Sequence, residues 1–122
     1  MSTLATILVA LVALLHVYFL VLEMFLWDKP AGLKAFGQTL EAAQASRVLA
    51  ANQGLYNGFL AAGLLWGIAL GPAGNGVKIF FLCCVIVAGL FGAATASRKI
   101  LFVQALPAAI ALGLVLLSPG SP

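Results

Sequence analysis

The chain has 122 residues, of which 64% are hydrophobic and 7% are charged, and its formal net charge is +3. A soluble domain carries about 25% charged residues, so this composition excludes an ordinary water-exposed surface and predicts a chain embedded in lipid. The basic residues lie between apolar segments and do not form one basic face, which argues against a nucleic-acid partner.

Four apolar segments predict a single transmembrane domain over residues 1–122, with spans at about 3–27, 48–70, 77–96 and 100–117. The first segment lacks a basic leader and a small-residue cleavage site, so we expect it to stay as a span. Within the first connection, Leu33, Phe36 and Leu40 recur at helical spacing, which predicts a short interfacial helix. The predicted fold is all-α: an integral membrane four-helix bundle with one short interfacial helix.

The distribution of basic residues predicts the orientation of these spans. Lys78 is the one basic residue on the side that holds both termini and the second connection. The other five lie in the first and third connections: Lys29, Lys34, Arg47, Arg98 and Lys99. Because lysine and arginine favour the cytoplasmic side, both termini are expected outside the cytoplasm.

Small residues at four-residue spacing predict where helices pack closely. The second span carries two such ridges and the third span one: Gly54, Gly58 and Ala62; Gly63, Gly67 and Gly71; Ala88, Gly92 and Ala96. Small side chains let membrane helices approach each other, so the second span is expected to be central. We therefore expect leucine at Gly58 or Gly63 to disrupt assembly more than any change in an exposed loop.

Polar side chains gather in the half of the spans that we expect to face the cytoplasm. His16 and Glu23 are seven residues apart and share one stripe of the first helix. At comparable depth on the second span, Glu23 is expected to meet Asn52 or Gln53, and His16 to approach the level of Tyr56 and Asn57. We predict a cytoplasm-facing binding pocket with these side chains: Glu23, His16, Asn52, Gln53, Tyr56 and Asn57.

A structural role for the same side chains stays open. Amide hydrogen bonds between membrane helices are used simply to hold helices together. Glu23 can instead reach the surface and pair with Lys29 or Arg47. His16 lies too deep to do so, but a neutral structural histidine would satisfy the pattern. The adjacent cysteines at 83–84 lack zinc or C-x-x-C spacing and are interpreted as small apolar core residues.

Two motifs support a family resemblance. Residues 15–27 read Leu-His-Val-Tyr-Phe-Leu-Val-Leu-Glu-Met-Phe-Leu-Trp, and residues 50–59 read Ala-Ala-Asn-Gln-Gly-Leu-Tyr-Asn-Gly-Phe. Together they resemble a family of small four-span bacterial membrane proteins known only as a domain of unknown function, over essentially the whole chain. The resemblance implies an integral protein of the bacterial inner membrane. It supplies no activity, substrate or catalytic residue.

Three functions fit these observations. The first is a homo-oligomeric binder or transporter of a small molecule or cation, in which Glu23 exchanges a proton for the cation and His16 is a second titrating group. The second is a structural or accessory membrane subunit without its own substrate. The third is a membrane enzyme or redox partner acting on a quinone or lipid, with His16 and Glu23 as acid and base and Tyr56 as donor.

The sequence contains no nucleophile motif, metal-ligand set or cofactor fingerprint, which argues against the enzyme. We therefore predict no catalytic residue, no bound metal and no cofactor. The expected partners are membrane lipids, further copies of the chain, and a small or lipophilic ligand.

Overall fold

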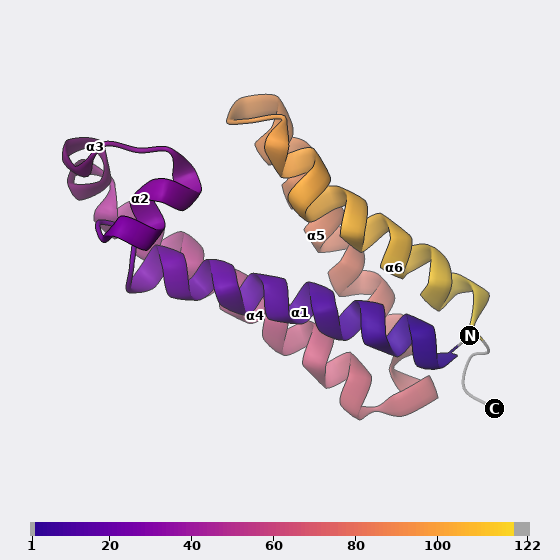
Figure 1. The fold of residues 1–122 in the computed structure, drawn as a ribbon. Coiled ribbons are helices and arrows are strands. Elements are labelled where there is room, and N and C mark those ends of the chain that lie inside the picture. The colour runs from indigo at the N-terminus through magenta and orange to yellow at the C-terminus, as the bar shows by residue number, and fades with distance from the viewer. Residues whose placement is uncertain (1, 119–122) are drawn as a thin grey trace. The chain divides into compact units, whose positions relative to one another are not determined.

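The computed structural model describes residues 2–118, and within this range the chain forms helices joined by short turns (Figure 1). The elements in chain order are α1 (Ser2–Met24), α2 (Pro30–Phe36), α3 (Leu40–Ala45), α4 (Arg47–Ala69), a 3₁₀ turn η1 (Gly71–Gly74), α5 (Asn75–Thr95), a π-helical turn η2 (Leu101–Ala105) and α6 (Leu106–Leu117). The all-α prediction is confirmed.

The chain divides into two compact units, and the long helices α1 and α4 contribute residues to both. One unit comprises residues 1–14 and 60–122, and the other comprises residues 15–59. The first is called the core unit and the second the Glu23 unit below. This division matters for function because each of the two sites described below lies within one unit.

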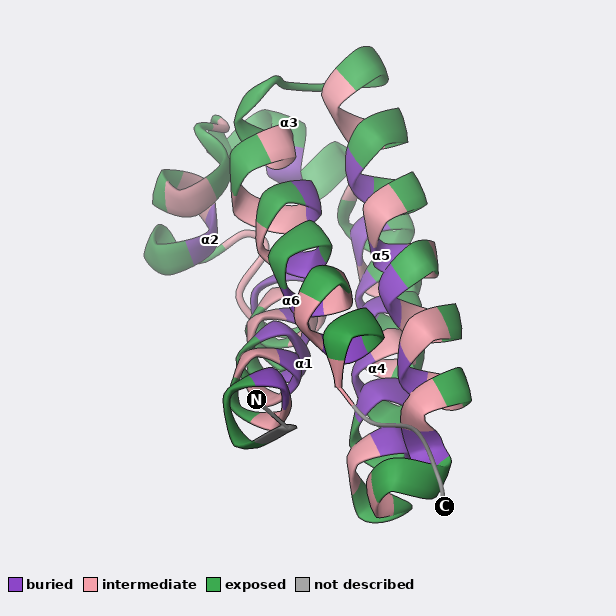
Figure 2. Cartoon of the chain, turned by 90° about the vertical axis from the view of Figure 1, so that its right-hand side faces the viewer, coloured by how far each residue is buried: buried purple, intermediate pink, exposed green. Residues whose placement is uncertain are grey.

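The core unit is held together by an apolar interior that α5 and α6 share with parts of α1 and α4. Its fully buried side chains include Val9, Leu64, Leu82, Val85 and Ala108. Buried residues follow one side of α5, and half-buried and exposed residues cover the rest of that helix (Figure 2). Small residues allow a close contact between α5 and η2, since a Cβ added at Gly89 would lie 2.8 Å from the backbone nitrogen of Ala105.

The π-helical turn η2 is explained by Pro107, which has no backbone N–H and crowds the preceding turn of a helix. Just before it, the Leu106 N–H donates to the Leu101 carbonyl, which is the five-residue spacing of a π-helix. Such turns absorb a proline inside a helix without ending it. The helix therefore does not end at Pro107, and α6 follows η2 directly from Leu106 to Leu117.

The first connection folds into two short helices, whereas the spacing of its apolar residues predicted one. Gly37 ends α2 in the left-handed region, with φ 63°, a conformation that glycine adopts without strain. Thr39 then caps α3, because its Oγ1 accepts a hydrogen bond from the Ala42 N–H at 3.1 Å. Leu33 and Phe36 thus belong to α2, whereas Leu40 belongs to α3. The single helix predicted from their spacing is therefore interrupted between residues 36 and 40.

The end of α1 also differs from the expected boundary. The helix ends at Met24, and the chain turns before Trp27. The turn brings the indole Nε1 of Trp27 to the Ser46 hydroxyl, to which it donates at 3.1 Å. This hydrogen bond between residues 27 and 46 fastens the two ends of the first connection.

Length and apolarity single out two helices that could cross a membrane, Thr3–Met24 and Gly71–Thr95, while Leu101–Leu117 is a shorter apolar helix. α4 is 23 residues long, but it contains two asparagines and a glutamine, which make it less apolar. The four-span arrangement therefore stays a prediction.

Candidate functional site

The centre of the candidate site is the carboxylate of Glu23, near the end of α1. Glu23 is 3% exposed. Gln53 donates its Nε2 to Oε2 of Glu23 at 3.0 Å, and Asn57 donates its Nδ2 to Oε1. Each carboxyl oxygen therefore has one amide donor, and all three side chains lie in the Glu23 unit, where α1 and α4 run side by side (Figure 1).

The geometry of α4 explains why these two amides reach one carboxylate. Gln53 and Asn57 are four residues apart, so they lie one above the other on the same face of the helix. Gly54 lies between them and allows close approach, since a Cβ added there would lie 3.1 Å from Glu23 Cβ and 2.6 Å from Met24 Cγ. A larger residue at Gly54 would push the helices apart and lengthen both hydrogen bonds.

His16 occupies the same helix as Glu23, two turns earlier, and it is completely buried. Its ring meets the ring of Phe19 edge-on, with centroids 5.4 Å apart. His16 and Glu23 are thus both removed from the surface. Charged groups are costly in such surroundings, and buried ionisable side chains are functional candidates for this reason.

Asn52 and Tyr56 lie outside the hydrogen-bonded cluster of Glu23, Gln53 and Asn57. Asn52 is exposed and donates its Nδ2 to the Val48 carbonyl one turn earlier in α4. Tyr56 is 58% exposed, and its ring packs near that of Phe59. Each residue precedes a member of the cluster by one position, which turns its side chain by about 100° around the helix.

Comparison of depths predicted that Glu23 would meet Asn52 or Gln53, and the structure shows the contact with Gln53. Asn57, which was expected at the level of His16, also bonds Glu23. The alternative in which Glu23 reaches the surface and pairs with Lys29 or Arg47 is wrong, because Glu23 is buried. Arg47 instead forms an ion pair with Asp28 at 3.5 Å.

An open pocket of about 360 Å³ lies at the end of α1 and the start of α4. Its lining combines aromatic, charged and apolar side chains, among them Trp27, Asp28, Lys29, Arg47 and Asn52. Of the six predicted site residues, Asn52 alone belongs to this lining. The sequence predicted one pocket around Glu23, whereas the structure has a covered carboxylate and a separate polar pocket in the same unit.

Two structural features of the Glu23 unit were not connected with the site in the sequence. Gly54 was noted only as part of a packing ridge, yet it sets the distance at which the amides reach Glu23. Its position between Gln53 and Asn57 was the available signal. The hydrogen bond from Trp27 to Ser46 had no signal, because the residues are 19 positions apart in an irregular connection.

The cluster of Glu23, Gln53 and Asn57 offers one carboxylate and two amide groups as possible ligands. Among residues 2–118, no three histidine, cysteine or acidic side chains lie close enough together to hold a metal ion. A carboxylate with two amides instead suits protons and hard cations, because each amide carries an oxygen acceptor beside its nitrogen donor.

Comparison with known proteins places the same residues inside a family of unknown function. Residues 10–116 match the family model described as "Protein of unknown function (DUF1304)". The chain is also similar to "Uncharacterized protein YpaA" of Lactococcus lactis subsp. lactis (strain IL1403), with 33% identity over 114 residues that cover 92% of this chain and 96% of that protein. No solved structure matches the chain.

Proposed function

The chain belongs to the DUF1304 family of proteins of unknown function, and on this premise we propose that it is a small integral protein of the bacterial inner membrane that binds or transports a small molecule or cation as a homo-oligomer. The single observation that carries this proposal is the buried Glu23 carboxylate with an amide donor on each oxygen. An ionisable group placed this way inside an apolar helix is by default a functional site.

Insertion into a membrane is supported by the exposure of the apolar helices. Only 28% and 22% of the residues in the most apolar stretches of Thr3–Met24 and Gly71–Thr95 are buried. A core helix of a soluble protein would be mostly buried. Large apolar side chains are instead exposed along α5, including Phe80, Val87, Leu90 and Phe91. Lipid would cover such a surface, whereas soluble monomers rarely expose extended apolar patches.

We expect both termini to lie outside the cytoplasm. Five basic residues lie in the first and third connections, and the single basic residue on the other side, Lys78, is buried. A reporter that is active only in the cytoplasm, fused after Pro122, should therefore give background signal, and the same reporter inserted after Lys34 should be active. A strong signal from the fusion after Pro122 would contradict this topology.

Glu23 is proposed to act as an exchange group. When Glu23 releases its proton, a monovalent cation takes its place and the net charge of the site is unchanged. The amides of Gln53 and Asn57 donate N–H groups in this structure. Half-turn rotation of each amide would present its oxygen instead, which would surround the cation with carboxylate and amide oxygens. A chain with about four spans is too small to enclose a wide path alone, so the proposal includes assembly of several copies.

Exchange is tested in vesicles that contain purified protein and a trapped pH-sensitive dye. Inward gradients of Na⁺, K⁺ or tetramethylammonium are applied in turn. At least one should drive proton release through the wild-type protein, and Glu23→Gln should abolish it, because glutamine keeps the shape of the side chain and loses the proton. Glu41→Gln is the matched control, since Glu41 is an exposed carboxylate in α3. No exchange with any of the three cations would overturn transport of a cation.

A structural role is the second candidate, and one observation favours it. Glu23 is almost fully covered, and both of its oxygens already accept a hydrogen bond. A closed network of this kind is what residues that hold helices together form. On this reading the protein is an accessory subunit, and Glu23→Gln would be silent in every functional assay.

A further inference from the structure

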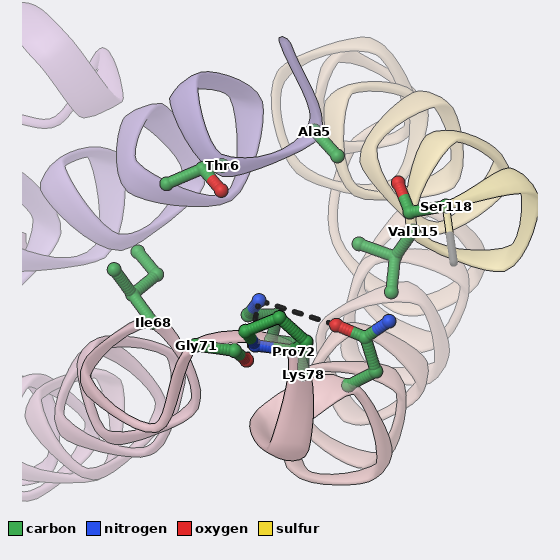
Figure 3. Close-up of a pocket in the computed structure, with 9 residues that line it drawn as sticks. Ala5, Thr6, Ile68, Gly71, Pro72, Lys78, Val115 and Ser118 are labelled. Carbon is green, nitrogen blue, oxygen red and sulfur yellow. Dashed lines mark hydrogen bonds between the residues drawn. The ribbon is translucent and has the colours of Figure 1, made fainter. Parts of the chain in front are cut away.

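A second polar site lies in the core unit and is separate from the Glu23 cluster. It is a cavity of about 140 Å³ bounded by α1, the end of α4, η1, the start of α5 and the end of α6 (Figure 3). Residues that line it include Thr6, Ile68, Gly71, Lys78 and Ser118. None of them was predicted to form a site.

The unusual feature of this cavity is the ammonium group of Lys78. The residue is 6% exposed, although lysine is almost never fully buried unless it is paired. Its Nζ donates to the Gly71 carbonyl and to Asn75 Oδ1, both at 3.3 Å; Figure 3 draws these contacts as dashed lines. Both acceptors are neutral. An ammonium has three N–H groups, so these two acceptors leave one N–H without a partner among the described residues.

Among the described residues of the core unit, no acidic side chain accompanies this ammonium. The three acidic residues of the chain are Glu23, Asp28 and Glu41, and all belong to the Glu23 unit. Within residues 2–118, Lys78 takes part in no ion pair. A buried charge without a counter-charge is costly, and proteins compensate for it by pairing it or by binding an ion.

We propose that this cavity binds a phosphate group, for which Lys78 supplies the counter-charge. The site has the features that favour an anion. α5 begins at Asn75 and is 21 residues long, so the positive end of its dipole points to the same region, and no side chain caps this end. The group can belong to an anionic phospholipid headgroup or to free phosphate, since both offer the same oxygens.

The test compares the thermal unfolding of the wild-type protein, purified in a neutral detergent, under two pairs of conditions. The first pair is sodium phosphate against sodium chloride at equal ionic strength. The second is phosphatidylglycerol against phosphatidylcholine in mixed micelles. A rise in the unfolding midpoint with phosphate identifies free phosphate as the ligand. A rise with phosphatidylglycerol alone identifies a lipid headgroup.

Substitution of Lys78 tests the role of its charge. Glutamine keeps N–H donors for Gly71 and Asn75 but removes the positive charge, so Lys78→Gln should weaken the apparent affinity by at least about tenfold. Lys99→Gln makes the same change of charge at an exposed residue and should respond like the wild-type protein. If Lys78→Gln does not fold, Thr6→Leu replaces it, because this variant narrows the cavity and keeps the ammonium; its response should be weakened as well.

Three results would overturn the proposal. The first is a wild-type midpoint that responds to neither phosphate nor phosphatidylglycerol. The second is a folded Lys78→Gln protein that responds as Lys99→Gln does. The third is a folded Thr6→Leu protein with an undiminished response.

Discussion

Glu23→Leu should lower the free energy of unfolding by about 1–3 kcal/mol, because it leaves the Asn57 amide buried without its acceptor. Asn57 is 8% exposed, whereas Gln53 is exposed and can turn to another partner. Glu23→Gln should cost less than about 1 kcal/mol, since a neutral side chain of the same shape still accepts one hydrogen bond. Thermal unfolding followed by circular dichroism in detergent measures both variants.

The matched pair at Glu41 provides the control. Glu41 is exposed in α3, so Glu41→Leu and Glu41→Gln should each change stability by no more than about 0.5 kcal/mol. If Glu23→Leu is as mild as Glu41→Leu, the amide network contributes nothing to stability. Combined with the vesicle assay, the result also separates the two proposed functions. A stable but inactive Glu23→Gln protein supports exchange through Glu23, and a stable variant that exchanges like the wild-type protein shows that Glu23 only holds the helices together.

Gly89→Ala should destabilise the protein by about 1–3 kcal/mol, because the added methyl group would meet backbone that cannot move aside. The new Cβ would lie 2.8 Å from the Ala105 nitrogen and 3.0 Å from its Cα. Gly113 in α6 is the matched control, since a Cβ there would meet nothing within 4 Å. Gly113→Ala should raise stability by about 0.4–1 kcal/mol, through lower entropy of the unfolded chain.

Chemical or thermal unfolding of both alanine variants decides this prediction. Equal stability of Gly89→Ala and Gly113→Ala would show that the contact between α5 and η2 has room for an added methyl group. Alanine at the ridge positions Gly58 and Gly63 should destabilise the protein less than Gly89→Ala. Their added Cβ atoms would meet the side-chain end of Leu20 and the ring of Phe81, which can rotate, instead of backbone.

The sequence predicted the helices because apolar runs separated by glycine, proline and charged residues leave few alternatives. It also predicted that Glu23 would meet Asn52 or Gln53, since counting the helical rise gives the depth of a side chain. Depth does not give the direction of a side chain around the helix axis. Asn52 and Gln53 have nearly the same depth, but about 100° of rotation separates them, so the choice between them needed the packed structure.

Two features depended on contacts that no local pattern reports. Lys78 was counted as a connection charge, yet the turn Gly71–Gly74 folds a carbonyl onto its ammonium and the residue is buried. The break between α2 and α3 had a local signal in Gly37 and Thr39, but the apolar spacing across it favoured one helix. The regular spacing of apolar residues therefore led to a prediction of one helix, although Gly37 and Thr39 are typical of a helix end and a helix start.

The amide pair on α4 has a consequence for how α1 and α4 find their alignment during assembly. If α4 slips by one position in one direction, Glu23 faces Gly54 and Gly58, which have no side-chain donors. In the other direction, the bulky ring of Tyr56 arrives where Asn57 fits. Either slip also replaces Gly54 at the close contact by a larger neighbour, so packing and hydrogen bonding fail together. Misaligned arrangements of α1 and α4 are therefore higher in energy than the native one. The position of Glu23 on α1 thus fixes the register of α4.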